Sequence, residues 1–440
     1  MASMFGMNGS GQWQDEGRPK SWREKILYWF VNGKAPLTAM SAKLTGATIT
    51  DPNHYWWTQT PAFQVGSITD AYLDVLSTPV SAATTAADTT VYLKIDQTTQ
   101  AFWNEVRIGQ VVMVQSLVDP SARCNLYVTA KTLNGASSYL TATVLSVDNG
   151  GLTAATPNIT VIGNMNAEGA TVPTNMVWQP TKFYNYTQIF RDSLKLTGTA
   201  EATKTRYGSP EYLRQKKQTL EQHAFGQERS FLWGKKYEAN GGPAAADASY
   251  SLRAMDGVVT FCEDHAAASK HAGRNVQNFL TEVAAGTTWK TQGKDVLNAW
   301  IEQIFRYGDS ERFCFCGNGA VAGINILAEL YGQMTITPMI TSYGIKVVNW
   351  VTPFGEINLK THPLFNLDSI WRNAILAFNP KTLKWCPLKG RDTHFISCKT
   401  PGGSGETSID GRIEEYLTEG TLELGIPEES GILYNVGVDA

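Results

Sequence analysis

The sequence predicts an α+β protein, and three observations support this. The stretch from Pro210 to Trp233 contains no internal proline and predicts one long helix. Residues 79–172 are rich in Thr, Ala and Val and contain short β-prone runs, which predicts a small strand-rich domain. Between 255 and 399, helical and strand patterns alternate. Since 440 residues exceed what one core usually organises, two or three domains are expected.

The long helix has clear start signals. Ser209 can cap the unpaired amides, Pro210 suits the first helical position, and Glu211 places negative charge at the positive end of the helix dipole. Seven apolar residues recur near helical spacing: Tyr212, Leu213, Leu220, Ala224, Phe225, Phe231 and Leu232. The basic residues of the polar face outnumber its glutamates: Arg214, Lys216, Lys217, Arg229, Lys235 and Lys236 against Glu211, Glu221 and Glu228. A solvated face is the simplest interpretation.

The strand-rich segment shows β-prone runs separated by turn residues. The runs are Val91–Ile95, Val111–Val114, Leu126–Thr129, Leu140–Val147 and Ile159–Ile162. Glycines and Asn-Gly or Asp-Pro pairs lie between them. About five strands predict a small barrel or sandwich.

The segment 255–399 predicts helices at about 295–307 and 320–331, with strands at 312–316 and 345–351. A hairpin limb at 356–360 is expected to follow. The last strand, at 420–424, is expected to return to the domain of the long helix.

The first sixty residues are irregular, and they predict an arm with one short amphipathic helix at 22–31. Five tryptophans of this arm would be costly in water: Trp13, Trp22, Trp29, Trp56 and Trp57. We therefore expect the arm to lie on its own body or on a neighbour, with a disordered tail as the alternative.

Composition favours assembly over a solitary monomer. Charged residues make up 18% of the chain against about 25% in ordinary soluble proteins, while aromatic residues reach 11%, so some surface is expected to be buried against partners. The net charge of -3 predicts no strong overall attraction to nucleic acid or membrane, although one basic face could contact phosphates.

The expected compartment is a reducing cytoplasm, because six irregularly spaced cysteines do not form a secreted disulfide framework. No apolar run is long enough to span a bilayer, and the amino terminus lacks an export pattern, so a soluble protein is expected.

Two glycine motifs resemble phosphate-binding loops. Gly317 and Gly319, followed by Gly323, open a helix after a strand, but their spacing departs from the dinucleotide fingerprint and the ribose-binding acid is absent. The loop Gly402–Gly405 lacks the lysine that reaches the phosphates. We predict no cofactor at either motif.

Metal and catalytic motifs are equally weak. Cys314 and Cys316 share one strand face and would need a second ligand pair, for which Cys386 and Cys398 are poor candidates. The group Cys262, His265 and His271 lacks an obvious fourth ligand. The sequence contains no HExxH or GxSxG motif and no evident triad or carboxylate pair. We predict no catalytic, cofactor-binding or metal residues, and no enzyme.

The order of several short motifs resembles the major capsid proteins of tailed bacteriophages, in a branch with a β-rich domain inserted in the extended loop. The resemblance begins with Asn185–Phe190, Leu194–Thr199, Tyr207–Gly208 and the long helix that ends at Gly234. Further landmarks follow in order: Met255–Val259, Phe305–Gly308, Tyr343–Gly344, Thr352–Gly355, Glu419–Gly425 and Gly431–Asn435. Together they cover nearly the whole chain.

The resemblance implies the Johnson fold, with four regions. These are an N-terminal arm (1–60), an extended loop (61–200) with an inserted β-rich domain at about 79–172, a peripheral domain (201–254 and 400–440) with a spine helix at about 210–233, and an axial domain (255–399). The loop would be a two-stranded arm with limbs at 61–78 and 172–196, and insertions survive best at such exposed tips.

The implied function is to self-assemble, through hexamers and pentamers, into the icosahedral head of a tailed double-stranded DNA phage. The expected partners are other copies of the chain, portal and possibly scaffolding or cement proteins, and packaged DNA without sequence specificity, but no membrane. The protein would be found in the virion after assembly in the host cytoplasm. One alternative is an encapsulin-like cellular compartment, and a distant one is a nucleotide-dependent enzyme built on 312–351.

Overall fold

A computed structural model describes residues 35–439 except 42, 45, 60–61, 81–85, 97–101, 118, 149–157, 205–209, 241–250, 267–274, 332–334, 343–344 and 398–410. The helix expected at 22–31, with Trp13, Trp22 and Trp29, lies outside the described residues. The chain forms two units. Of the described residues, the smaller unit contains those within 57–183, and the larger unit contains those within 35–56, 184–266 and 275–439.

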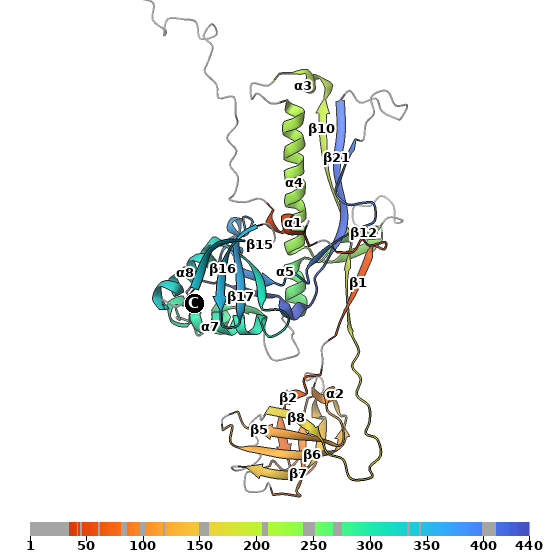
Figure 1. Ribbon diagram of the computed structural model, residues 1–440, viewed down its shortest axis with the longest axis vertical. Helices are drawn as coiled ribbons and strands as arrows, with labels where there is room; N and C mark the ends of the chain where they lie inside the picture. The colour runs from red at the N-terminus through yellow and green to blue at the C-terminus, as the bar shows by residue number, and fades with distance from the viewer. Residues whose placement is uncertain are drawn as a thin grey trace, which may run out of the picture. The chain divides into compact units, whose positions relative to one another are not determined.

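The smaller unit is a seven-stranded antiparallel sheet with the order β2-β8-β5-β6-β7-β4-β3 (Figure 1). Its strands are β2 (Val65–Ser67), β3 (Asp70–Tyr72), β4 (Thr90–Lys94), β5 (Gln110–Gln115), β6 (Arg123–Thr132), β7 (Tyr139–Asp148) and β8 (Asn158–Asn164). The two edge strands, β2 and β3, are joined by Ile68 and Thr69 alone, so the edges lie close and the sheet must curl. The prediction was a small barrel or sandwich of about five strands, whereas the structure has one curled sheet of seven strands, in which β2 and β3 are not paired with each other. Strands β2 and β3 were not predicted, because three residues give too short a pattern.

The core of the smaller unit follows from alternation along its strands. Residues of β5 alternate between buried and half-buried, and Val112 and Val114 face a core that Leu126 and Val128 of β6 share. A short helix, α2 (Phe102–Glu105), adds two buried aromatic side chains to this core. The ammonium group of Lys131 donates to the carbonyls of Trp103 and Val106 at 2.6 Å each, and burial lowers the pKa of this lysine.

The strands that flank the smaller unit differ from the predicted limbs of the extended loop. Strands β1 (Asn53–Thr58) and β9 (Thr181–Tyr186) form a two-stranded ribbon, and the boundary between the units falls inside both strands. The predicted pairing of 61–78 with 172–196 is wrong. Residues 65–72 contribute two strands to the curled sheet, and 188–197 form β10 (Gln188–Thr197), which pairs with a strand near the C-terminus.

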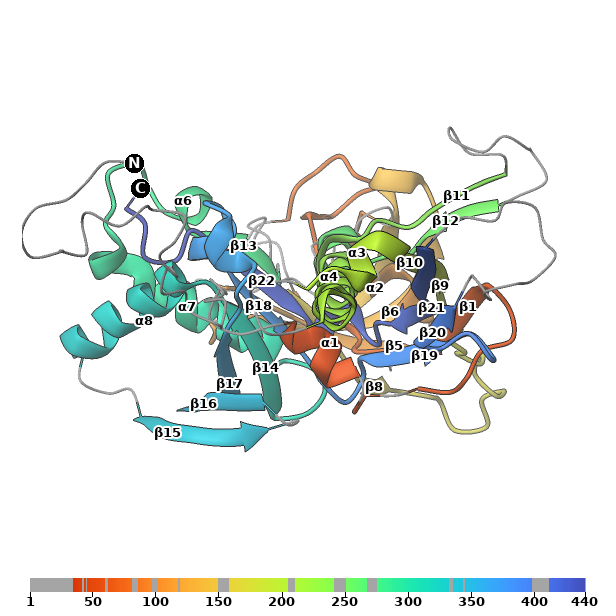
Figure 2. The same cartoon turned by 90° about the horizontal axis from the view of Figure 1, so that it is seen from above.

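In the larger unit, the long helix α4 (Glu211–Trp233) lies alongside β10 and β21 (Gly411–Glu423) (Figures 1 and 2). The predicted helix is confirmed to within one residue. Pro210 is its N-cap, whereas Ser209 lies outside the described residues. Strand β21 pairs with β10 on one side and with β20 (His394–Ser397) and β19 (Lys384–Pro387) on the other. The strand expected at 420–424 therefore does return to the long helix.

The other sheet of the larger unit has seven strands in mixed directions, in the order β13-β22-β18-β14-β17-β16-β15. Its strands are β13 (Val276–Asn278), β14 (Glu311–Cys316), β15 (Thr335–Ser342), β16 (Ile345–Thr352), β17 (Gly355–Thr361), β18 (Ile375–Phe378) and β22 (Gly431–Tyr434). Helices α7 (Trp289–Ile304) and α8 (Asn318–Tyr331) cover one face (Figure 2). The helices and strands predicted between 295 and 360 are confirmed.

The C-terminal strand corrects one predicted boundary. Residues 400–440 were expected to belong wholly to the region of the long helix. Strand β22 instead enters the mixed sheet, because Ile432 and Leu433 pair with β13 on one side and β18 on the other.

Short elements complete the larger unit: α1 (Pro36–Ser41), α3 (Gly198–Ala202), β11 (Tyr237–Asn240), β12 (Ser251–Ala254), α5 (Val258–Phe261), a π-helical turn (Cys262–Ala266), α6 (Phe279–Glu282) and 3₁₀ turns at Phe365–Leu367, Trp371–Asn373 and Pro427–Glu429.

A buried arginine closes the end of α7. Arg312 is fully buried and donates to the carbonyls of Ile304, Tyr307, Asp309 and Glu311, at 2.7–3.2 Å for all but the Tyr307 contact. A helix end leaves carbonyls without partners, and this guanidinium supplies the missing donors. Burial lowers the pKa of Arg312, with the nearby Glu429 opposing the effect.

Two glycines allow α4 to end against the following segment. The amide of Gly257 donates to the carbonyl of Gly234 at 2.9 Å. A Cβ atom at Gly257 would lie 2.6 Å from the carbonyl oxygen of Leu232, and one at Gly234 would lie 2.6 Å from that of Met255. Both contacts involve backbone, which cannot move aside without disturbing the helix end.

We predict that Gly257→Ala destabilises the protein, because its Cβ atom would collide with backbone. The matched control is Gly226→Ala in α4, where nothing described lies within 4 Å of the added Cβ atom. This control should raise the free energy of unfolding by about 0.5–1 kcal/mol, since alanine is the better helix former. Denaturant titration of both variants provides the measurement. Equal effects of the two changes would contradict the packing argument.

Candidate functional site: the junctions and surfaces of the long helix

A buried histidine joins α4 to the four-stranded sheet. His223 Nδ1 lies 2.7 Å from Asp192 Oδ2 on β10, and His223 Nε2 lies 2.8 Å from Thr418 Oγ1 on β21. Gln227, one turn further along the helix, approaches the same ring nitrogen at 3.0 Å. The edge of the Phe190 ring packs against the imidazole. This histidine therefore ties the helix to both of the long strands beside it.

A second buried junction is centred on Glu228, which is fully buried. Its carboxylate accepts hydrogen bonds from the amides of Leu37 (2.8 Å) and Thr38 (2.6 Å), and from the Thr38 hydroxyl (2.7 Å). His362, at the end of β17 and also fully buried, completes the set at 2.7 Å. Four donors thus fill the acceptor capacity of one carboxylate. The junction connects α1, the long helix and the mixed sheet.

The tautomer of His362 follows from its two contacts. The amide of Leu364 donates to Nδ1 at 3.2 Å, so this nitrogen acts as the acceptor. The ring proton of the neutral imidazole therefore resides on Nε2, which donates to Glu228.

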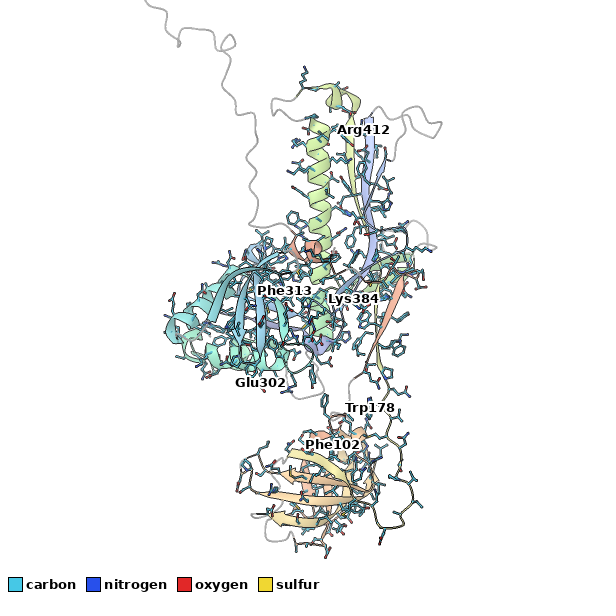
Figure 3. The ribbon with its side chains drawn as sticks, in the orientation of Figure 1. Phe102, Trp178, Glu302, Phe313, Lys384 and Arg412 are labelled. Carbon is cyan, nitrogen blue, oxygen red and sulfur yellow. The ribbon has the colours of Figure 1, made fainter. Side chains whose placement is uncertain are left out.

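Near the start of the long helix, cations lie over aromatic rings. The ammonium group of Lys216 lies 3.7 Å from the centre of the Phe395 ring, and the guanidinium of Arg412 lies 4.3 Å from that of Tyr212. Arg412 is labelled at the end of β21 in Figure 3. Glu211 accepts hydrogen bonds from Arg214 and Gln215, and these lower the pKa of its carboxyl.

The exposed side of α4 corrects the predicted apolar pattern. Phe231 and Leu232 are buried, whereas Leu213 is 56% exposed and Leu220 is 44% exposed. Lys217 lies between these two leucines at helical spacing and is also exposed. We call Leu213, Lys217 and Leu220 the outer stripe of the helix.

The glycines that resemble a dinucleotide-binding loop, Gly317, Gly319 and Gly323, lie where the backbone packs closely against neighbouring segments. A Cβ atom at Gly317 would lie 2.2 Å from the carbonyl oxygen of Arg372, and one at Gly319 would lie 1.9 Å from Asn373 Oδ1. Gly323 meets the backbone of Gly437 in the same way. The second glycine motif, Gly402–Gly405, lies outside the described residues.

The candidate cysteines are buried in the core. Cys314 and Cys316 share the face of β14 that packs against α7 and α8, as the alternation predicted. Phe313, labelled in Figure 3, and Phe315 lie on the other face, where both contact Phe378. Burial raises the pKa of the Cys316 thiol to about 12 and also raises that of Cys314.

In the group Cys262, His265 and His271, the first is fully buried and the last lies outside the described residues. Burial lowers the pKa of His265. The structure brings together a different set, His54, Cys386 and Glu423, whose ligand atoms all lie within 4.8 Å of one another. Sequence reasoning missed this set because His54 lies more than 300 residues before Cys386 and Glu423 in the chain.

These features define a class of α+β protein in which a long helix, laid along a sheet of long strands, is joined by buried polar contacts to a mixed α/β sheet. The chain matches the family described as SU10 major capsid protein over residues 8–437, and it belongs to that family. It is 26% identical over 433 residues to the major capsid protein of Pseudomonas phage PaMx41, covering 94% of this chain and 91% of the relative.

Similar solved structures include three shells. The capsid of a native GTA particle has a TM-score of 0.42 at 7% identity, covering 99% of this chain and 100% of the other. The capsid of Cyanophage P-SCSP1u has a TM-score of 0.39 at 11% identity, covering 62% and 79%. The SrpI encapsulin of Synechococcus elongatus PCC 7942 has a TM-score of 0.36 at 10% identity, covering 60% and 78%.

The protein is thus a structural component of a phage shell, with the α+β fold of tailed-phage capsid proteins. Among the residues that the structure describes, no helix combines the length and the apolar character needed to cross a bilayer.

We predict that Glu228→Ala lowers the free energy of unfolding by at least about 3 kcal/mol, because each buried donor left without a partner costs about 1–3 kcal/mol. The matched control is Glu302→Ala on α7, an exposed glutamate labelled in Figure 3. It should change stability by less than about 0.5 kcal/mol. The free energy of unfolding of both variants is measured by denaturant titration. Similar decreases in the two variants would show that the hydrogen bonds to Glu228 do not stabilise the protein more than an exposed glutamate does.

Proposed function

We propose that the chain assembles through hexamers and pentamers into the icosahedral head of a tailed double-stranded DNA phage and encloses the genome. The observation that carries this proposal is the family match over residues 8–437. The role is architectural and involves no catalysis. Portal, scaffolding and cement proteins are further proposed partners, and assembly is proposed to occur in the host cytoplasm.

We assign the predicted regions within this proposal. The long helix with β10, β19, β20 and β21 forms the peripheral domain, and the mixed sheet with α7 and α8 forms the axial domain. Strand β9 belongs to the extended loop, and the curled sheet of the smaller unit is its insertion. Residues up to the end of β1 form the arm, which pairs with β9. Ring contacts between identical copies are heterologous, so closure of the ring limits growth.

Exposed apolar side chains are the proposed contacts between copies. On the long helix they are the two leucines of the outer stripe. On the smaller unit, Leu117 is 71% exposed and Leu133 is 67% exposed. Large apolar side chains left in water favour burial against a partner. Each contact is modest alone, but contacts summed around a closed shell become strong.

The alternatives make different predictions about the particle. An encapsulin-like compartment would enclose an enzyme and contain no DNA, and a nucleotide-dependent enzyme would remain a monomer or small oligomer. Negative-stain imaging of the expressed protein, with a measurement of nuclease-protected DNA in particles from infected cells, distinguishes the three. Compact single molecules at high concentration would overturn the shell proposal.

Removal of the smaller unit should impair assembly but not folding of the larger unit. Deletion of Thr85–Ala167 alone is unsuitable, because β2 and β3 would lose their partners β8 and β4. The side-chain amide of Gln59 donates to the carbonyl of Trp178 at 3.4 Å, so the two positions are close and a short Gly-Ser linker can replace residues 60–177. We expect a folded chain with a lower particle yield or lower heat resistance of particles. Unchanged yield and heat resistance would contradict the proposed packing between copies.

We also propose that exposed cations of the long helix lie near packaged DNA and contact phosphates without reading sequence. Lys217 and Arg229 are exposed and available for this role. Lys216, which sequence reasoning paired with Lys217, is half-buried over Phe395 and is therefore a poor candidate.

The double variant Lys217→Glu/Arg229→Glu should reduce nuclease-protected DNA per particle, because each change replaces an attraction for phosphate with a repulsion. The control is Lys290→Glu/Lys389→Glu, with the same charge change at exposed positions away from the helix. DNA is measured relative to shell protein in purified particles. If the two double variants retain equal amounts of DNA, the basic side of the helix does not face the genome.

A further inference from the structure

Three chemically different ligand groups meet where the arm crosses the four-stranded sheet. His54 lies on β1, Cys386 on β19 and Glu423 at the end of β21, and their ligand atoms lie within 4.8 Å of one another. His54 Nε2 is 3.1 Å from Glu423 Oε2. All three belong to the larger unit.

The surroundings hold this group in place. The Cys386 thiol is fully buried, while the side chains of His54 and Glu423 are 17% and 22% exposed. The arm runs along β19 here: the amide of Gly46 donates to the Trp385 carbonyl at 2.7 Å, and the amide of Ile49 donates to the Pro387 carbonyl at 3.0 Å. Gly46 itself covers the thiol, since a Cβ atom there would lie 2.6 Å from Cys386 Sγ.

We infer that His54, Cys386 and Glu423 form a zinc site that fastens the arm to the sheet. One imidazole nitrogen, one thiolate and one carboxylate oxygen are the donor types that zinc takes in proteins, at about 2.0–2.3 Å. Three such donors leave a fourth tetrahedral position, and the partial exposure of His54 and Glu423 lets water reach it. Softer and harder metals suit this mixed set less well.

Zinc binding would have to fit the contacts that Glu423 already makes and would have to displace the proton of the Cys386 thiol. Lys384, labelled in Figure 3, approaches the other carboxylate oxygen of Glu423 at 3.5 Å, so Oε2 remains directed at His54. Burial, followed by the charge of Glu423, raises the pKa of the Cys386 thiol to about 11. Zinc would take the place of the thiol proton, so binding releases a proton and strengthens with rising pH.

The consequence would be a crosslink between distant parts of the chain. His54 precedes the smaller unit, whereas Cys386 and Glu423 follow it. A metal bound only by the folded arrangement stabilises that arrangement in proportion to its affinity. The site would therefore set how firmly the arm stays on its own subunit. This inference does not depend on the proposed shell function.

The test uses the full-length purified protein, stripped of metal by a chelator and titrated with Co²⁺ and then Zn²⁺. We expect equimolar Co²⁺ binding with a thiolate-to-cobalt charge-transfer band, displacement of Co²⁺ by Zn²⁺, and a higher melting temperature with Zn²⁺. Cys386→Ser and Glu423→Gln should abolish the band and the thermal shift. His394→Gln, a change of an exposed histidine on β20, should preserve both.

The wild-type protein alone can refute the inference: absence of the charge-transfer band at saturating Co²⁺ would overturn it. A band that persists in Cys386→Ser would also overturn it, because another thiol would then be the ligand. If Cys386→Ser does not fold, His54→Gln provides the second comparison, and full retention of equimolar Zn²⁺ in that variant would count against the site.

Discussion

The buried carboxylate of Glu228 is the constraint on which the larger unit depends. A charge without access to water is tolerated only where hydrogen bonds replace its hydration. Here α1 offers two amides and a hydroxyl, and His362 offers a ring N–H. Because the donors come from segments 134 and about 190 residues away, the carboxylate is satisfied only when α1, the long helix and the mixed sheet are all in place. The junction thus favours one arrangement of the three.

The sequence predicted features that depend on local pattern. The alternation of Cys314 and Cys316 with Phe313 and Phe315 predicted the two faces of β14. The absence of proline inside 211–233 predicted the length of α4. The five longer strands of the curled sheet were also recognisable. Long-range features were not. Nothing near Glu228 in the sequence points to His362. Strand β22 was assigned with the rest of 400–440 to the region of the long helix, and only its pairing with β13 and β18 shows that it belongs to the mixed sheet.

The outer stripe shows a second case in which local sequence pattern does not predict burial within the single chain. Leu213 and Leu220 repeat at the spacing of a core face, and their exposure in a single chain departs from what that spacing normally means. In an ordinary monomer this would be a liability for solubility. Under the proposed assembly, the same pattern would describe a face that becomes interior only when copies meet. Sequence periodicity alone does not distinguish such a face from one that packs within its own chain.

The position of β21 and β22 in the chain has a consequence for synthesis. Strand β21 is the central strand beside the long helix, and β22 lies inside the mixed sheet, yet both come later in the chain than the strands they pair with. Until they leave the ribosome, β10 lacks its partner strand and β18 is paired on one side only, with β14. Both sheets therefore reach their full pairing only after β21 and β22 have been made, since such distant pairings form late. A chain that stops before β21 would leave β10, β19 and β20 without the strand they share.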